Sequence, residues 1–295
     1  MPTRRSILTS LAAGAGFAAV RPAFGVTPLP PEVKTALNGP VGLQLWSLRA
    51  DLPKDVPGTL SRLRGLGLRH VEAAGLPNGL TAEAFRKALD SANLVCRSAH
   101  MPFERLRDDA AGAVKEAKAL GCTFVVCPWI PHDKAGFAAD DAAKAADVFN
   151  KASRAAKAEG LRLGYHAHGY EFLPGAGGTL FDALVKNTDP AVGIEVDIFW
   201  AKAGGVDPAK LIASLSGRVP LIHIKDMKKG LALPAGSSGA PEDSDVAAGQ
   251  GQLDLPGIFR AAIKSGVELY YIEDESTKPW EQIPVTLKYL SSLKL

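Results

Sequence analysis

The stretch LRLGYH, residues Leu161–His166, decides the fold more directly than any other segment of the chain. It is a short, largely apolar run that directly follows residues 140–159, an Ala- and Lys-rich stretch with helical periodicity. A helix followed at once by a short strand is the repeating unit of an α/β protein. Similar short runs recur along the chain with helical stretches between them. The strand candidates are Val41–Ser47, Leu68–Ala73, Leu94–Ala99, Thr123–Pro128, Leu161–His166, Val192–Asp197, Val219–Ile224 and Leu269–Glu273.

Several of these runs are too apolar for a sheet that is buried on one face only, so we expect parallel strands covered by helices. The helical stretches begin with typical N-terminal caps: Thr81 opens Thr81–Asn93, while Asp207-Pro208 and Asp254-Leu255-Pro256 start two more. Further helices are expected over 107–120 and 140–159. No G-x-G-x-x-G motif follows the first strand, which argues against a dinucleotide fold. The 295 residues therefore predict one (β/α)8 TIM barrel, a fold that takes about 250 residues.

The first 26 residues differ from the rest of the chain. Arg4-Arg5 precede a weakly apolar run, Leu8–Val20, and Ala23-Phe24-Gly25 has the small-x-small pattern of a cleavage site. The run is too short to anchor the chain in a bilayer. We therefore predict a twin-arginine signal peptide over 1–26, a Pro-rich connector over 27–40, the barrel over 41–295 and a periplasmic protein without a stable membrane anchor. The alternative is a basic, disordered N-terminus.

Composition excludes some kinds of partner. The net charge is only +3, and no stretch concentrates Lys or Arg with aromatic residues, so we expect no nucleic-acid partner. The three cysteines, Cys96, Cys122 and Cys127, are odd in number and lack C-x-x-C spacing. Buried thiols are expected rather than disulfide bonds or a zinc site. No feature indicates an oligomeric state.

One predicted connection is unusual. Gly230–Gly251, after the seventh strand, is rich in Gly, Ala, Ser, Pro and acidic residues. It is too long for an ordinary βα loop, and on a barrel it lies at the active face. Either it closes over a ligand or it is a tolerated insertion.

Polar residues at the C-terminal ends of barrel strands point into the active mouth. Such residues end nearly every predicted strand. In order along the chain they are Gln44, Trp46 and Arg49; Glu72; His100; Trp129; His166, His168 and Glu171; Asp197; His223, Lys225 and Asp226; and Glu273, Asp274 and Glu275.

The ends of the last four predicted strands carry, in chain order, a His or Glu, an Asp, a His and a Glu. Burying these groups is costly unless they pair with each other or with a cation. Carboxylates with imidazoles suit Mn²⁺, Co²⁺, Zn²⁺ or Mg²⁺, the last least, because Mg²⁺ takes imidazole less readily. The sequence therefore predicts one divalent metal at the mouth.

Several of these segments resemble the signature segments of the sugar phosphate isomerase/epimerase family, within the xylose isomerase-like barrel superfamily. The resemblance runs from about residue 41 to the end. It rests on GLQLWSLR at 42–49, SAH at 98–100, GYHAHGYEF at 164–172, VDIFW at 196–200, LIHIKD at 221–226, GQGQLD at 249–254 and YIEDE at 271–275.

The resemblance implies a metal bound by an acid after the fifth strand and by Asp197, His223 and Glu273. The fifth-strand Glu of better-known members aligns with His166 here, and this chain instead has His166-x-His168 followed by Glu171. We favour Glu171 as the fourth ligand, with direct ligation by His166 or His168 as the alternative.

The resemblance also implies proton abstraction beside a carbonyl and an enediolate, with the metal as Lewis acid. The catalytic candidates are Glu171, Glu273 and Lys225. The residues expected to contact substrate are Arg49, Glu72, His100, Trp129, His166, His168 and Trp200, with Trp46, Trp129 and Trp200 suited to stacking on a sugar ring.

Three functions follow as hypotheses. The first is a metal-dependent isomerase or epimerase acting on a keto-sugar or related polyol. The second is a lyase or dehydratase acting on a keto-sugar or keto-glycoside, in which a leaving group departs. The third is a non-catalytic sugar-binding barrel. All three take a small-molecule sugar or glycoside. An endonuclease would need more metal ligands and a basic groove.

Overall fold

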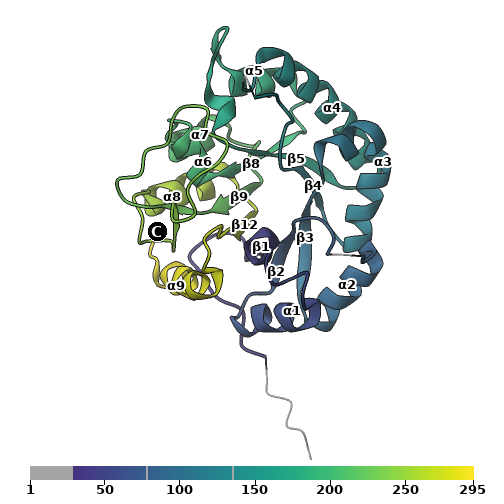
Figure 1. The fold of residues 1–295 in the computed structure, drawn as a ribbon, viewed down its shortest axis with the longest axis vertical. Helices are drawn as coiled ribbons and strands as arrows, with labels where there is room; N and C mark the ends of the chain where they lie inside the picture. Colours follow the sequence, from purple (N-terminus) through teal and green to yellow (C-terminus); the bar gives the residue numbers. More distant parts are fainter. Residues whose placement is uncertain (1–28, 78, 135) are drawn as a thin grey trace, which may run out of the picture.

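The computed structural model describes residues 29–77, 79–134 and 136–295. Its barrel strands are β1 (Val41–Gln44), β2 (His70–Ala73), β3 (Val95–His100), β4 (Phe124–Cys127), β5 (Arg162–Ala167), β8 (Gly193–Asp197), β9 (Leu221–Ile224) and β12 (Leu269–Ile272). They close in the order β1-β12-β9-β8-β5-β4-β3-β2, and every neighbouring pair is parallel. Figure 1 shows the helices ringing this barrel. The predicted (β/α)8 barrel is confirmed.

The ring of helices follows the predicted caps. It consists of α1 (Val56–Gly65), α2 (Ala82–Ser91), α3 (Phe103–Leu120), α4 (Ala139–Ala158), α5 (Leu180–Asn187), α6 (Ile198–Ala203), α7 (Pro208–Ser214), α8 (Leu255–Ser265) and α9 (Pro279–Ser292). The side chains of Thr81, Asp207 and Asp254 accept hydrogen bonds from backbone N–H groups in the first turns of α2, α7 and α8. Helix α3 begins at Phe103, before the expected Arg107, because Phe103 and Leu106 pack into the core.

The barrel interior is divided into two parts. Toward the N-terminal ends of the strands it is filled by an apolar cluster of Phe124, Val126, Leu221, Leu269 and Tyr271. Toward the C-terminal ends it holds buried polar side chains, among them Gln44, Glu72, Ser98, His166, Glu195 and His223. The apolar part seals one end of the barrel, so the polar groups face the mouth at which TIM-barrel chemistry takes place.

The first strand is shorter than expected. It ends at Gln44, and residues Leu45–Leu48 form a 3-10 turn, η1. The turn begins there because the Gln44 side-chain oxygen accepts the backbone N–H of Trp46 at 3.0 Å. Leu45 and Leu48 are buried by the turn, whereas Trp46 is left 47% exposed.

The long connection after β9 is tied down at both ends. Strand β10 (Asp226–Met227) pairs antiparallel with β11 (Asp245–Val246). The Asp226 carboxylate accepts the backbone N–H groups of Met227, Gly249, Gly251 and Leu253 at 2.9 to 3.2 Å. Glycine is required at 251, since a Cβ there would lie 2.2 Å from an Asp226 oxygen. This clamp holds the loop against the barrel mouth.

Two short hairpin strands, β6 (Pro174–Gly175) and β7 (Gly178–Thr179), follow the single turn η2 (Tyr170–Phe172). The cysteines are free and buried, as expected, and the sulfurs of Cys96 and Cys122 lie 3.5 Å apart. Their burial leaves these thiols remote from solvent.

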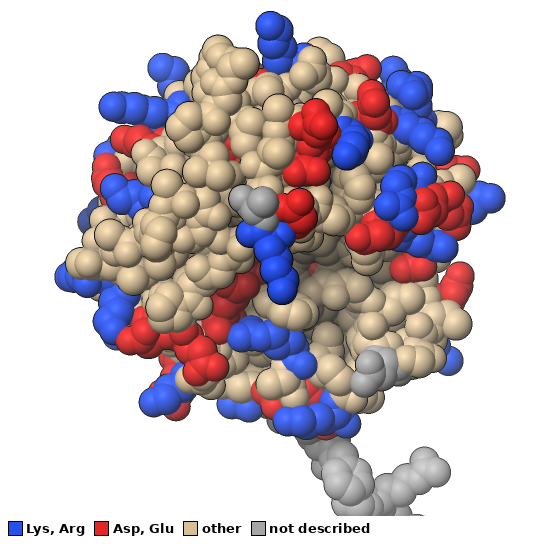
Figure 2. All heavy atoms as spheres, turned by 45° about the horizontal axis from the view of Figure 1, so that its top comes forward, with Lys and Arg blue, Asp and Glu red and all other residues tan. Residues whose placement is uncertain are grey.

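The predicted signal peptide, 1–26, and the start of the connector lie outside the described residues and stay predictions. Within the described ranges, no helix has both the length and the apolar character of a membrane span. The face in Figure 2 interleaves Lys and Arg with Asp and Glu, and no broad area carries one sign of charge. Surface ion pairs such as Lys118–Glu159 contribute to this mixture.

Candidate active site

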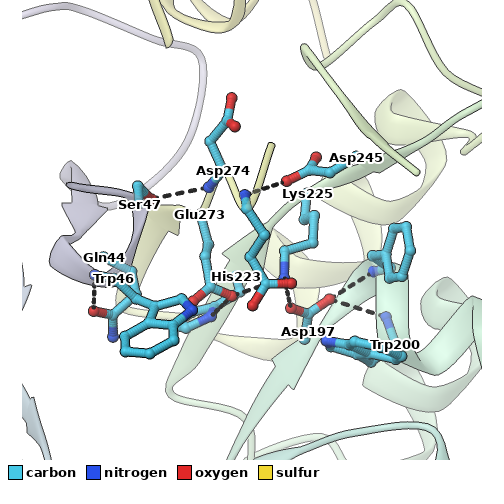
Figure 3. Close-up of polar contacts among 12 residues, drawn as sticks. Gln44, Trp46, Ser47, Asp197, Trp200, His223, Lys225, Asp245, Glu273 and Asp274 are labelled. Carbon is cyan, nitrogen blue, oxygen red and sulfur yellow. Dashed lines mark hydrogen bonds and ion pairs between the residues drawn. The ribbon is translucent and has the colours of Figure 1, made fainter. Parts of the chain in front are cut away.

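Four predicted strand-end residues converge at the barrel mouth. The ligand atoms of His166, Asp197, His223 and Glu273 all lie within 4.8 Å of one another. All four side chains are buried, and they come from the ends of β5, β8, β9 and β12. Figure 3 shows Asp197, His223 and Glu273 pointing toward a common centre. We call these four residues the floor group.

The floor group fits a divalent cation. One oxygen of Asp197, Oδ1, accepts the backbone N–H groups of Phe199 and Trp200 at 2.8 and 3.0 Å, which fixes the carboxylate at the start of α6. Its other oxygen, Oδ2, has no hydrogen-bond partner in the described part of the chain, and neither has the buried Nδ1 atom of His166. Buried polar atoms are normally satisfied, so two such atoms without a hydrogen bond beside His223 and Glu273 suit a cation held by mixed N and O ligands.

Lys225 places a buried positive charge beside the floor group. Its Nζ lies 2.9 Å from Glu273, 2.9 Å from Glu275 and 3.5 Å from Asp197. At these distances the ammonium forms ion pairs with the three carboxylates, but it does not form a hydrogen bond with any of them. Burial would lower the pKa of Lys225, but the carboxylates of Glu273, Asp197 and Glu275 outweigh burial and raise the pKa well above its usual value. The surrounding carboxylates therefore favour the charged form of Lys225.

Two carboxylates lie beneath the floor group, deeper in the barrel. The side chains of Glu72 and Glu195 are fully buried. Glu72 Oε2 lies 2.6 Å from His223 Nε2 and accepts a hydrogen bond from Gln44 at 2.8 Å, and its other oxygen accepts one from Ser98. A carboxylate on the far nitrogen of a ligating histidine is the usual way in which proteins orient such a ring.

Glu195 gathers three histidines around one oxygen. Its Oε2 lies 3.0 Å from His100 Nε2, 3.2 Å from His166 Nδ1 and 3.3 Å from His223 Nε2. His100, His166, Glu195 and His223 thus form a second cluster with cation-binding geometry, overlapping the floor group. Sequence reasoning missed Glu195. The available signal was its position two residues before Asp197, since alternate residues of a strand share a face.

The buried carboxylates favour the charged forms of His100 and His223. Burial would lower the pKa of His100, but Glu72 and Glu195 raise that pKa to about 9. Glu195 and Glu273 likewise outweigh burial and raise the pKa of His223 well above its usual value. Since a histidine must be neutral at the ligating nitrogen, cation binding here displaces a proton from His223.

Glu171, the favoured fourth ligand, belongs to neither cluster. It is fully buried in η2, where its carboxylate accepts the Tyr165 hydroxyl and the backbone N–H of His168 at 2.9 Å. Burial raises the pKa of Glu171 to about 7. Between the two alternatives for the fifth strand, the structure brings His166, and not Glu171, to the other three ligands, because Glu171 is turned into the packing behind β5.

A cavity of about 640 Å³ opens above the floor group. The predicted substrate contacts and catalytic residues that line it are Arg49, His100, Trp129, His166, His168, Trp200, Lys225 and Glu273, together with Trp46. Glu72 and Glu171 are not among its lining residues, because Glu72 lies below His223 and Glu171 lies behind β5. Residues of the long loop, including Pro241, Ser244 and Asp245, form part of the cavity wall.

His168 is the neutral polar group of the cavity wall. Its ring lies between Trp129 and Trp200, at centroid distances of 5.1 and 5.6 Å. Burial, assisted by His166 and Lys225, lowers the pKa of His168 well below its usual value. Its Nδ1 atom lacks a hydrogen-bond partner within the described ranges. A neutral imidazole with a free nitrogen is able to accept a proton.

Asp245 is a second residue that the sequence analysis missed. It stands in β11, lines the cavity, and accepts the backbone N–H of Glu275 at 2.7 Å. Burial, together with Asp274 and Glu275, raises the pKa of Asp245 well above its usual value, although Lys225 opposes this. It was missed because an acidic residue in a polar loop has no sequence pattern that sets it apart from a solvated one.

The comparisons with known proteins agree with this geometry. The family described as "Xylose isomerase-like TIM barrel" matches residues 60–293. A sugar phosphate isomerase/epimerase from Parabacteroides distasonis is 26% identical, with a TM-score of 0.72 over 90% of this chain and 98% of that one. A search of curated proteins finds no match.

Two more distant structures share the fold. The probable 3-DHS dehydratase from Bacillus anthracis is 13% identical, with a TM-score of 0.66 over 86% of this chain and all (100%) of that one. The IOLI protein with a bound zinc atom is 15% identical, with a TM-score of 0.62 over 84% of this chain and 94% of that one.

Proposed function

The chain belongs to the xylose isomerase-like TIM barrel family, and we propose that it is a divalent-metal-dependent isomerase or epimerase acting on a keto-sugar or related polyol. The observation that carries the proposal is the convergence of His166, Asp197, His223 and Glu273 beneath a cavity, with the Lys225 cation beside them. The similarity to a sugar phosphate isomerase/epimerase supports it.

A divalent metal, if bound, would be held by the floor group and would supply Lewis-acid chemistry at the substrate carbonyl. The chain supplies the proton transfers. His168 lines the cavity, and its Nδ1 atom, which has no hydrogen bond in the described part of the chain, accepts the proton from the carbon beside the substrate carbonyl. The electron pair of the broken C–H bond moves to the carbonyl oxygen to form an enediolate, whose charge the Lys225 ammonium offsets. Return of the proton to the neighbouring carbon isomerises the sugar, and its return to the opposite face epimerises it.

A lyase or dehydratase is the second candidate, and Asp245 favours it. A buried carboxyl group at the wall of the cavity, whose pKa burial raises above its usual value, is suited to protonate a leaving group. After the same C–H cleavage, the electron pair expels that group instead of being reprotonated, and an unsaturated product forms.

The decisive experiment combines metal analysis with product analysis. Purified protein is expected to hold about one equivalent of divalent metal, lost in His223→Ala and Asp197→Ala but kept in His132→Ala, whose ring lies outside both clusters. A panel of keto-sugars and keto-glycosides is then incubated in D₂O. Deuterium in a rearranged sugar supports the isomerase, and an unsaturated or cleaved product supports the lyase. Metal-free protein with unchanged sugar binding would support the non-catalytic barrel instead.

We further propose that residues 1–26 direct periplasmic export by the twin-arginine route. The support is Arg4-Arg5, the short apolar run and the Ala23-Phe24-Gly25 cleavage pattern. A reporter fused to residues 1–30 should reach the periplasm and should stay in the cytoplasm after Arg4→Lys, Arg5→Lys substitution. Cytoplasmic retention of the unaltered fusion would contradict the proposal.

A further inference from the structure

The main cavity continues past Trp46 into a smaller pocket of about 130 Å³. The two spaces share Trp46, Arg49, Ala74 and Gly75 as walls. The remaining walls of the smaller pocket are all apolar: Leu45, Leu52, Pro53, Leu76 and Pro77. The site therefore has a polar inner part above the floor group and an apolar outer part beyond Trp46.

Trp46 is held as a fixed platform between the two parts. Its side chain is 47% exposed. The Arg49 guanidinium lies 5.5 Å from the ring centroid, donates to the Trp46 carbonyl at 3.1 Å, and donates to the Glu275 carbonyl at 2.8 Å. The backbone N–H of Trp46 is bound by Gln44. A large aromatic side chain that is both exposed and braced is the kind of surface feature that marks a ligand site.

The two ends of the site face each other across the barrel. In the closed order of eight strands, β1 and β5 are four places apart and therefore opposite. Trp46 follows β1, whereas Trp129 and Trp200 flank His168 at the end of β5. Figure 3 shows Trp46 and Trp200 on opposite sides of His223 and Lys225. A ligand that fills the inner cavity is thus directed from the Trp129–Trp200 side toward Trp46.

Building on the proposed function, we infer that the substrate is a keto-glycoside, with its ketone on the sugar ring and an aromatic aglycone; the unoxidised glycosides used below serve as binding probes for it. Its sugar ring lies above the floor group, and its aglycone stacks on Trp46 and fills the apolar pocket. The pocket volume of about 130 Å³ is close to that of the roughly 150 Å³ apolar protein cavity that binds benzene. The side chains that form the apolar walls, those of Leu45, Leu52, Pro53, Leu76 and Pro77, offer sugar hydroxyls no hydrogen-bond partner. A free monosaccharide therefore has no apolar group to fill this pocket.

The test compares phenyl and methyl glycosides of the same sugar, glucose or galactose in both anomers, by calorimetric titration of the metal-loaded protein. For at least one sugar, the phenyl compound should bind about tenfold more tightly than the methyl compound, since stacking and burial of one ring are worth about that factor. Trp46→Ala and Leu76→Asn should reduce the ratio toward one, and Trp46→Phe should keep most of it.

Trp280→Ala is the matched control. Trp280 also carries an arginine, Arg62, over its ring at 3.9 Å, but it lines neither cavity. This variant should keep the wild-type preference. If no phenyl glycoside binds more tightly than its methyl counterpart, or if the preference survives Trp46→Ala, the inference is overturned. These titrations need no turnover, so they can fail while the metal content and the activity on keto-sugars still support the proposed function.

Discussion

The Nε2 atom of His223 lies 2.6 Å from a carboxylate oxygen of Glu72, deep in the barrel. The other ring nitrogen, Nδ1, faces Glu273 at 3.2 Å, on the side of the floor group. One imidazole thus joins two layers of the site: a buried carboxylate that orients the ring, and the ligand set at the cavity floor.

Glu72→Gln is expected to weaken divalent-metal binding about 10- to 100-fold, because the neutral amide holds His223 less firmly and makes the ring a weaker base. Metal affinity should be measured with a competing chelator, and the far-UV circular dichroism should not change. Glu116→Gln, a change outside both clusters, serves as the control. Equal affinities of wild type and Glu72→Gln would contradict the orienting role.

His166→Ala should lower metal affinity by at least about tenfold, since the structure places His166 in the floor group. Glu171→Gln should keep wild-type affinity, because the Glu171 carboxylate is bound to Tyr165 and to the His168 backbone instead. Metal content after dialysis separates the two variants. The reverse result, with metal lost in Glu171→Gln and kept in His166→Ala, would restore Glu171 as the fourth ligand.

Glu171 also predicts a pH dependence of stability. Burial raises the pKa of Glu171 from its ordinary value of 4.5 to about 7. A group whose pKa is raised on folding stabilises the fold fully below the unfolded pKa, and this contribution is lost as the pH rises through the folded pKa. The unfolding free energy of the wild type should therefore fall by up to about 3 kcal/mol as the pH rises from 4.5 to 7, and Glu171→Gln should not show this fall. Denaturant melts across this range, with Glu116→Gln as reference, test this; parallel curves for wild type and Glu171→Gln would refute it.

Lys225→Met should leave Glu273 and Asp197 without their buried cation. We expect a loss of about 3 kcal/mol in unfolding free energy for the metal-free protein, partly recovered when metal is added. Turnover should fall about 10²- to 10³-fold, because the ammonium no longer offsets enediolate charge. Lys228→Met, at an exposed lysine paired with Asp243, should change neither quantity. Normal turnover in Lys225→Met would remove Lys225 from the proposed chemistry.

The strands were predictable because each buried strand of a covered barrel is a short apolar run bounded by caps and turns. Seven of the eight have ends close to those expected, and the exception is instructive. The run from Val41 resumes after Gln44 with the apolar residues Leu45 and Trp46, so the sequence pattern extends the strand, whereas the Gln44 side chain ends it by accepting the Trp46 N–H.

The strand-end rule also identified nine of the 22 residues that line the cavity, but it could not rank the residues by depth. Glu72 and His100 both close short strands, yet Glu72 is fully buried beneath His223 while His100 reaches the cavity. Depth depends on the stagger of neighbouring strands, such as the register shift between Val71 and Glu72 against β3, which the sequence does not display.

The sequence by itself determined the eightfold βα repeat, the covered parallel strands and the identity of Asp197, His223 and Glu273 as ligand candidates, because these follow from local periodicity and from residue types at strand ends. Only the tertiary structure brought His166, rather than Glu171, close to the other candidate ligands and placed Glu195 beside it. It also set Trp46 at the rim between two connected pockets. The physical reason is that closure of the barrel sets the distances between side chains from different strands, and no local pattern in the chain encodes those distances.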